Sequence, residues 1–136
     1  MMLRLFTAFI TNKKGTRIAA IGWTLFLFLL CLIPGNEFPG VQIPFIDKWV
    51  HFILFAAFSF FWLSAYPSLG WRRLIIIFAF SVITGWLVEE LQGQLTMLGR
   101  NKDIWDILAD AVGGAIGVLI FAIFYFVYLR RKATTH

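Results

Sequence analysis

The sequence contains little charge and only one cysteine. Cys31 lies inside an apolar run, and a single cysteine excludes both an internal disulfide and a cysteine-rich metal site. Only 14% of the 136 residues are charged whereas 60% are hydrophobic, a balance outside the range of soluble globular domains. The basic residues sit at the ends of apolar runs, without the basic and aromatic pattern of a nucleic-acid-binding surface. A soluble domain, a disulfide-stabilised scaffold and a nucleic-acid-binding protein are therefore excluded.

Four long apolar runs predict an all-α, polytopic membrane protein whose four transmembrane helices form one bundle. An α-helix needs about 20 mostly apolar residues to cross the hydrocarbon core of a bilayer. The expected helices cover about residues 18–34, 47–66, 73–92 and 103–129. They form a single domain at 18–129, preceded by a basic interfacial segment at 1–17 and followed by a basic cytoplasmic tail at 130–136. The three prolines of Pro34–Pro44 exclude a helix in that loop.

The distribution of basic residues predicts the orientation. Nine of the twelve Lys and Arg residues lie in the N-terminal segment, the 66–73 loop and the C-terminal tail. The other three are Lys48, Arg100 and Lys102. Because basic loops stay in the cytoplasm, both termini are expected there, which four crossings also require. The lipid bilayer is thus the first partner that the sequence predicts.

The stretch Thr84–Gly117 holds five of the seven acidic residues between two apolar runs. Counting helical rise from the cytoplasmic ends of their helices places Glu89 and His51 at the same depth, about 24 Å in. Asp110 comes out at about 30 Å, the outer hydrocarbon boundary. An acidic group inside a membrane helix costs about 3 kcal/mol, which makes Glu89 a functional candidate.

Helical spacing turns these polar groups towards one place. Asp103, Asp106 and Asp110 share a stripe with Gly113 and Gly117, and small residues mark close helix approach in membranes. Equivalent stripes on the two preceding helices carry Glu89 with Gln92, and Asp47 with His51. The outer end of the bundle axis is therefore the expected site. The side chains expected to bind a ligand there are Asp47, Lys48, His51, Glu89, Gln92, Arg100, Asp103, Asp106 and Asp110.

Each polar group also has a structural interpretation. Asn101 or Asp103 can cap the last helix. Arg100 or Lys102 can neutralise Asp110. In this interpretation Glu89 forms a structural hydrogen bond with His51 or Gln92, and His51 is oriented by Asp47, one turn away.

These residues resemble the signature of VanZ-like membrane proteins. The matching pattern is Asp47-Lys48-x-x-His51, then Glu89-x-x-Gln92, then Arg100-x-x-Asp103-x-x-Asp106-x-x-x-Asp110-x-x-Gly113. It spans about half of the chain, and Asp110 stands where the family often has Asn. The resemblance implies a small multi-pass protein of the bacterial plasma membrane, in a family whose founding member is associated with resistance to the glycopeptide teicoplanin.

Three functions are compatible with this sequence. The first is an outward-facing polar pocket that recognises a cell-envelope lipid or a cell-wall precursor. The second is a membrane enzyme acting on such a lipid, with Glu89 or His51 as general base and Arg100 on a phosphate. The third is a purely structural or partner-binding bundle. No metal site is predicted, although an acidic cluster can hold Mg²⁺ or Ca²⁺. Transport is disfavoured because the inner halves of the helices are apolar.

Overall fold

The computed structural model describes residues 1–33, 45–96 and 101–134, and within these ranges the chain is helical with no strand. The helices are α1 (Met2–Thr11), α2 (Lys13–Leu32), α3 (Ile46–Ala65), α4 (Trp71–Gln94) and α5 (Ile104–Thr134). The last four are long and apolar enough to cross a membrane. The prediction of an all-α, multi-pass membrane protein is therefore confirmed, with a short fifth helix in addition.

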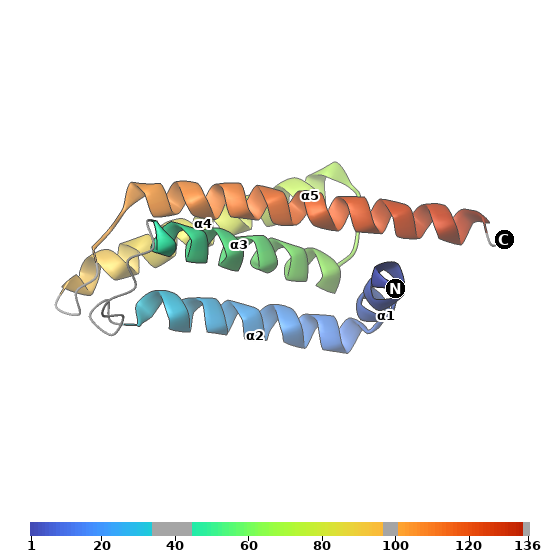
Figure 1. The fold of residues 1–136 in the computed structure, drawn as a ribbon, viewed down its shortest axis with the longest axis horizontal. Helices are drawn as coiled ribbons and strands as arrows, with labels where there is room; N and C mark the ends of the chain where they lie inside the picture. The colour runs from blue at the N-terminus through green and yellow to red at the C-terminus, as the bar shows by residue number, and fades with distance from the viewer. Residues whose placement is uncertain (34–44, 97–100, 135–136) are drawn as a thin grey trace.

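The four long helices form a bundle with both chain termini at one end (Figure 1). We call this end the terminal end. At the opposite end, α3 and α5 begin and α2 and α4 finish, so α3 and α5 run in the same direction. We call that opposite end the acidic end, since Asp47, Glu89 and Asp106 lie there.

The helix bounds differ from the expected ones mainly where charged residues continue a helix. α2 begins at Lys13 rather than near residue 18, because the Asn12 side chain accepts a hydrogen bond from the Gly15 N–H (2.9 Å) and caps the helix. α5 continues to Thr134 rather than 129, because basic residues are good helix formers that suit the negative end of the helix dipole. The expected tail is therefore largely helical. The expected loop at Pro34–Pro44 lies outside the described residues.

α1 is an amphipathic helix inside the segment that was expected to be interfacial. It lies across the terminal end of the bundle (Figure 1). Its Phe6 and Ile10 side chains are buried in a cluster with Leu63 of α3 and Phe121 of α5. The N-terminal segment thus closes that end of the bundle with apolar side chains.

Two tryptophans and a glutamine join α2 to the other helices. The Trp23 Nε1–H donates to the Leu54 carbonyl oxygen (2.9 Å), and the Trp62 Nε1–H donates to the Thr24 hydroxyl (3.1 Å). At the acidic end, the Gln92 amide of α4 donates to the Cys31 carbonyl oxygen (2.7 Å). Because a bilayer supplies no hydrophobic force between helices, such hydrogen bonds and close packing hold the bundle together.

Glycines bring α5 against the backbone of α3. A Cβ atom at position 113 would lie 3.0 Å from the Phe52 carbonyl carbon, and one at 117 would lie 2.9 Å from the Ala56 carbonyl carbon. In both cases it would meet the carbonyl oxygen still more closely. The expected close approach at Gly113-x-x-x-Gly117 is therefore confirmed, and its partner is α3.

Replacing Gly117 with alanine is expected to lower the free energy of unfolding by about 2 kcal/mol, because the new methyl group has to push two helix backbones apart. Gly22→Ala on α2 is the matched control, since a Cβ there meets no atom within 4 Å. It should be neutral or slightly stabilising, as alanine is the better helix former. Thermal unfolding in detergent micelles measures both, and equal melting temperatures would contradict the close contact.

Candidate functional site

Lys48 forms ion pairs with three carboxylates at the acidic end. Its Nζ lies 2.8 Å from Asp47 Oδ2, 2.7 Å from Asp103 Oδ2 and 3.0 Å from Asp106 Oδ1. Asp47 is its neighbour in the first turn of α3, whereas Asp103 and Asp106 lie at the start of α5. A single ammonium group therefore joins the beginnings of two parallel helices and leaves an excess of negative charge around it.

Asp103 also caps α5, as one of the sequence interpretations expected. Its Oδ1 accepts a hydrogen bond from the Trp105 N–H (2.9 Å). The Lys48 ammonium, and then the Trp105 N–H, lower the pKa of the Asp103 carboxyl below its ordinary value of 3.8. Asp103 is therefore ionised at neutral pH, and its structural role at the helix start is satisfied.

His51 and Asp110 form a buried pair between α3 and α5. His51 Nδ1 lies 2.9 Å from Asp110 Oδ1, and the exposed fractions of the two residues are 4% and 0%. The expected partner of His51, Asp47, binds Lys48 instead. His51 also stacks on Phe55, with ring planes 13° apart. The second oxygen of Asp110, Oδ2, is buried without a hydrogen-bond partner and faces Gly85 of α4, where a Cβ atom would lie 2.6 Å away.

Glu89 is fully buried and only half satisfied. Its Oε2 accepts a hydrogen bond from the backbone N–H of Asp103 (2.7 Å), while its Oε1 is buried without a partner. The expected hydrogen bonds from Glu89 to His51 or Gln92 are not formed, because Gln92 donates to α2 and His51 binds Asp110. Glu89 is therefore a membrane-buried carboxyl group with one free oxygen.

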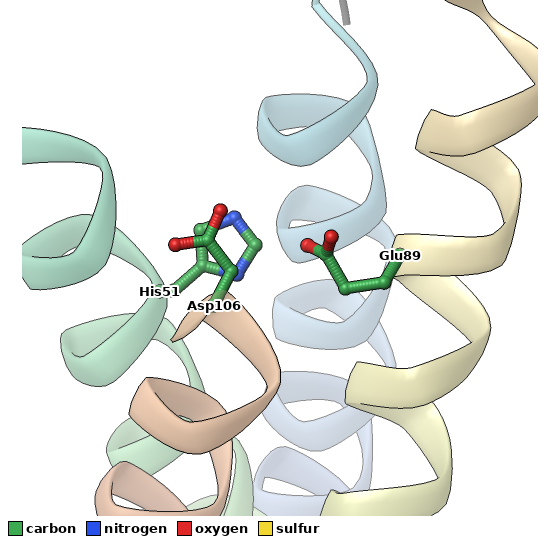
Figure 2. Close-up of side chains that lie close together, drawn as sticks. All are labelled: His51, Glu89 and Asp106. Atoms are coloured by element: carbon green, nitrogen blue, oxygen red, sulfur yellow. The ribbon is translucent and has the colours of Figure 1, made fainter. Parts of the chain in front are cut away.

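Three buried side chains from three helices converge at the Glu89 carboxyl group. Figure 2 shows the Glu89 carboxyl group of α4 pointing towards His51 of α3 and Asp106 of α5. One ligand atom from each of the three lies within 4.8 Å of the others. The sequence predicts that polar groups of the second, third and fourth long helices meet at this end of the bundle, and the cluster joins one residue from each. Helical rise placed His51 and Glu89 at one depth but Asp106 nearer the surface, and the structure brings all three together. We call these three residues the buried triad.

The remaining predicted residues lie around the triad rather than in it. Lys102 forms an ion pair with Glu90, not with Asp110. Gln92 joins α4 to α2, and Arg100 lies outside the described residues. The charged groups of the described site are thus five carboxylates against Lys48 and His51. Such a surface favours a cation or a ligand rich in hydrogen-bond donors.

An open apolar groove runs beside the charged cluster, where a polar pocket was expected. Its volume is about 570 Å³, and it lies between the first turns of α3 and α5. Lys48 is its charged lining residue. The other lining residues are Phe45, Trp49, Phe52, Trp105, Leu108, Ala109 and Val112. The other charged side chains of the described site do not line it.

Sequence reasoning did not find this groove. Trp49 and Trp105 are 59% and 63% exposed, and tryptophan is typical of the membrane–water interface. The signal was present in two exposed tryptophans at similar positions in two helices. They could not be placed side by side without knowing that α3 and α5 are neighbours.

Comparisons with protein-family models, with curated proteins and with solved structures found no match for this chain.

Proposed function

We propose that the protein binds a cell-envelope lipid or lipid-linked cell-wall precursor at the acidic end, in the manner of a VanZ-like protein. In this proposal the chain lies in a bacterial plasma membrane with both termini in the cytoplasm. The acidic end then faces outwards, where glycopeptides of the teicoplanin type meet their targets. The resemblance to the VanZ-like pattern supports the setting, and the geometry of the acidic end supports the ligand class.

The observation that carries the proposal is the apolar groove next to Lys48. Its walls are aromatic and aliphatic, and it belongs to helices long enough to cross a membrane. A groove of this kind suits a hydrocarbon chain, which enters it from the bilayer without meeting water. The exposed Trp49 and Trp105 rings suit the depth where the tail of a lipid meets its headgroup, because tryptophan is typical of that interface.

The charged cluster at the edge of the groove suits the headgroup. The side chain of Asp47 is 51% exposed and that of Asp103 is 36% exposed, so both carboxylates can accept hydrogen bonds from a ligand. Lys48 is the group shared by the groove and the cluster. Amine and hydroxyl donors, as in the peptide and sugar parts of a cell-wall precursor, match this acceptor-rich surface.

Filling the groove is expected to abolish lipid binding without unfolding the bundle. Ala109→Phe places a ring in the groove and should weaken binding of a polyprenyl-linked disaccharide peptide at least about tenfold, since the hydrophobic contact of the tail is lost. Ala115→Phe, an exposed position outside the groove on the same helix, is the matched control. Binding is measured with the protein in phosphatidylglycerol nanodiscs, and melting temperatures check that both variants fold.

Equal binding by the two variants would contradict the proposal, as would binding of plain phosphatidylglycerol with the same affinity. The cellular counterpart is teicoplanin susceptibility during expression of the chain. The native protein and Ala115→Phe should lower susceptibility, and Ala109→Phe should not.

A further inference from the structure

The buried triad has the composition of a metal centre. Histidine nitrogen and carboxylate oxygen are the usual protein ligands of divalent transition metals. Two ligand atoms bound to one such ion are about 3.4 Å apart in a tetrahedral site, and about 4.2 Å apart when opposite each other in an octahedral one. The ligand atoms of the triad lie within 4.8 Å of one another, so movements of an ångström or less bring them to these distances.

Glu89 supplies an independent sign of a missing partner. A fully buried carboxyl oxygen without a hydrogen bond is costly, and native proteins satisfy nearly all such atoms. Oε1 of Glu89 is such an atom, and the carboxyl group that carries it points towards His51 and Asp106 (Figure 2). In the part of the chain that the structure describes, the cations near the cluster are already paired. Lys48 binds aspartates and Lys102 binds Glu90.

Asp110 orients the His51 ring for metal binding. When the Nδ1–H donates to the Asp110 carboxylate, the lone pair of the imidazole is on Nε2, which is the nitrogen that faces away from Asp110. A carboxylate behind a metal-bound histidine fixes the ring and raises its basicity. Both His51 and Asp110 are buried, so the ring is held in one orientation.

We propose that His51, Glu89 and Asp106 bind one divalent transition-metal ion, such as Zn²⁺ or Mn²⁺, with Asp110 as the positioning residue behind His51. The imidazole selects these ions over Mg²⁺ and Ca²⁺, which prefer oxygen ligands alone. Three protein ligands leave a coordination position open to water or to a ligand oxygen. This proposal does not rest on lipid binding, because the triad lies behind the groove and does not line it.

The direct test is metal binding by the full chain in detergent micelles, after removal of any affinity tag and of bound metal with EDTA. Titration with Zn²⁺ or Mn²⁺ alone, followed by elemental analysis, is expected to show one bound ion per chain. Glu89→Gln should weaken binding at least about tenfold. Glu90→Gln, the adjacent acid outside the triad, should bind the metal like the native chain. Absence of saturable binding, or equal binding by both variants, overturns the proposal. Mg²⁺ binding as tight as that of Zn²⁺ overturns the role of His51.

Melting temperatures separate a metal site from a structural cluster. In EDTA, Glu89→Gln is expected to be at least as stable as the native chain, because the amide keeps the acceptor for the Asp103 N–H and removes a buried charge. With Zn²⁺ added, the native chain and Glu90→Gln should gain several degrees, whereas Glu89→Gln and Asp106→Asn should gain nothing. Two results together overturn the metal site and identify a purely structural cluster. In them, Glu89→Gln is less stable than the native chain in EDTA, and Zn²⁺ has no effect on the native chain.

Discussion

Asp110→Ala is expected to lower the free energy of unfolding by about 3 kcal/mol, the cost of leaving one member of a buried polar pair without its partner. His51 keeps its buried position in this variant but loses the acceptor of its Nδ1–H. Because both side chains are buried, solvent water does not replace that acceptor. Reversible unfolding in mixed detergent and dodecyl sulfate micelles measures the loss.

Asp110→Asn is the control for this prediction. The amide oxygen still accepts the Nδ1–H of His51, so the expected loss is less than about 1 kcal/mol. The double variant Asp110→Ala with His51→Leu should lose less than the sum of its single changes, since neither residue is then left unpaired. Strict additivity would show that the two side chains are not energetically coupled.

Lys48→Met is expected to lower the free energy of unfolding by about 2 kcal/mol at neutral pH. This value lies between those of an exposed and a buried ion pair, because the Lys48 side chain is 22% exposed. The methionine keeps the apolar stem but removes the charge that holds Asp47, Asp103 and Asp106 together. The double change Lys48→Met with Asp106→Asn should recover part of the loss. Thermal unfolding of both variants and of Lys48→Arg provides the measurement, and a variant as stable as the native chain would contradict it.

The loss in Lys48→Met should depend on pH in a known direction. The pKa of Asp103 is lowered in the folded protein, chiefly by Lys48, so its contribution to stability is present above the ordinary value of 3.8 and is lost as the pH falls through the lowered pKa. Without Lys48 only the smaller part that comes from the Trp105 N–H remains. The stability difference between the native chain and the variant is therefore expected to shrink as the pH falls below about 4.

The fold could largely be predicted because a bilayer leaves few choices. Apolar runs near 20 residues long have to be helices, and basic residues at their ends indicate which ends lie together. The helix ends could not be placed as well, since charged residues such as Lys13 and Arg130 continue a helix beyond the hydrocarbon. The helix α1 was missed because its apolar face is too short to stand out from a basic segment.

The sequence predicts which residues belong to the site better than it predicts which of them bind one another. Helical rise gives the depth of a residue to within a turn, which was enough to place His51 and Glu89 together. It gives no rotation of one helix relative to another. Hence His51 was assigned to Asp47 rather than to Asp110, and the backbone N–H that binds Glu89 was not considered.

The burial of α1 has a consequence for the biosynthesis of the protein. The Phe6 ring packs against Phe121 and Phe124, with ring centroids 6.1 and 5.4 Å apart. α1 is synthesised before α5, and three long helices lie between them in the chain. Until α5 is inserted, the apolar face of α1 lacks these two rings and has only α3 and the membrane surface to cover it. Full docking of α1 therefore follows insertion of α5, which supplies the rest of its apolar contact.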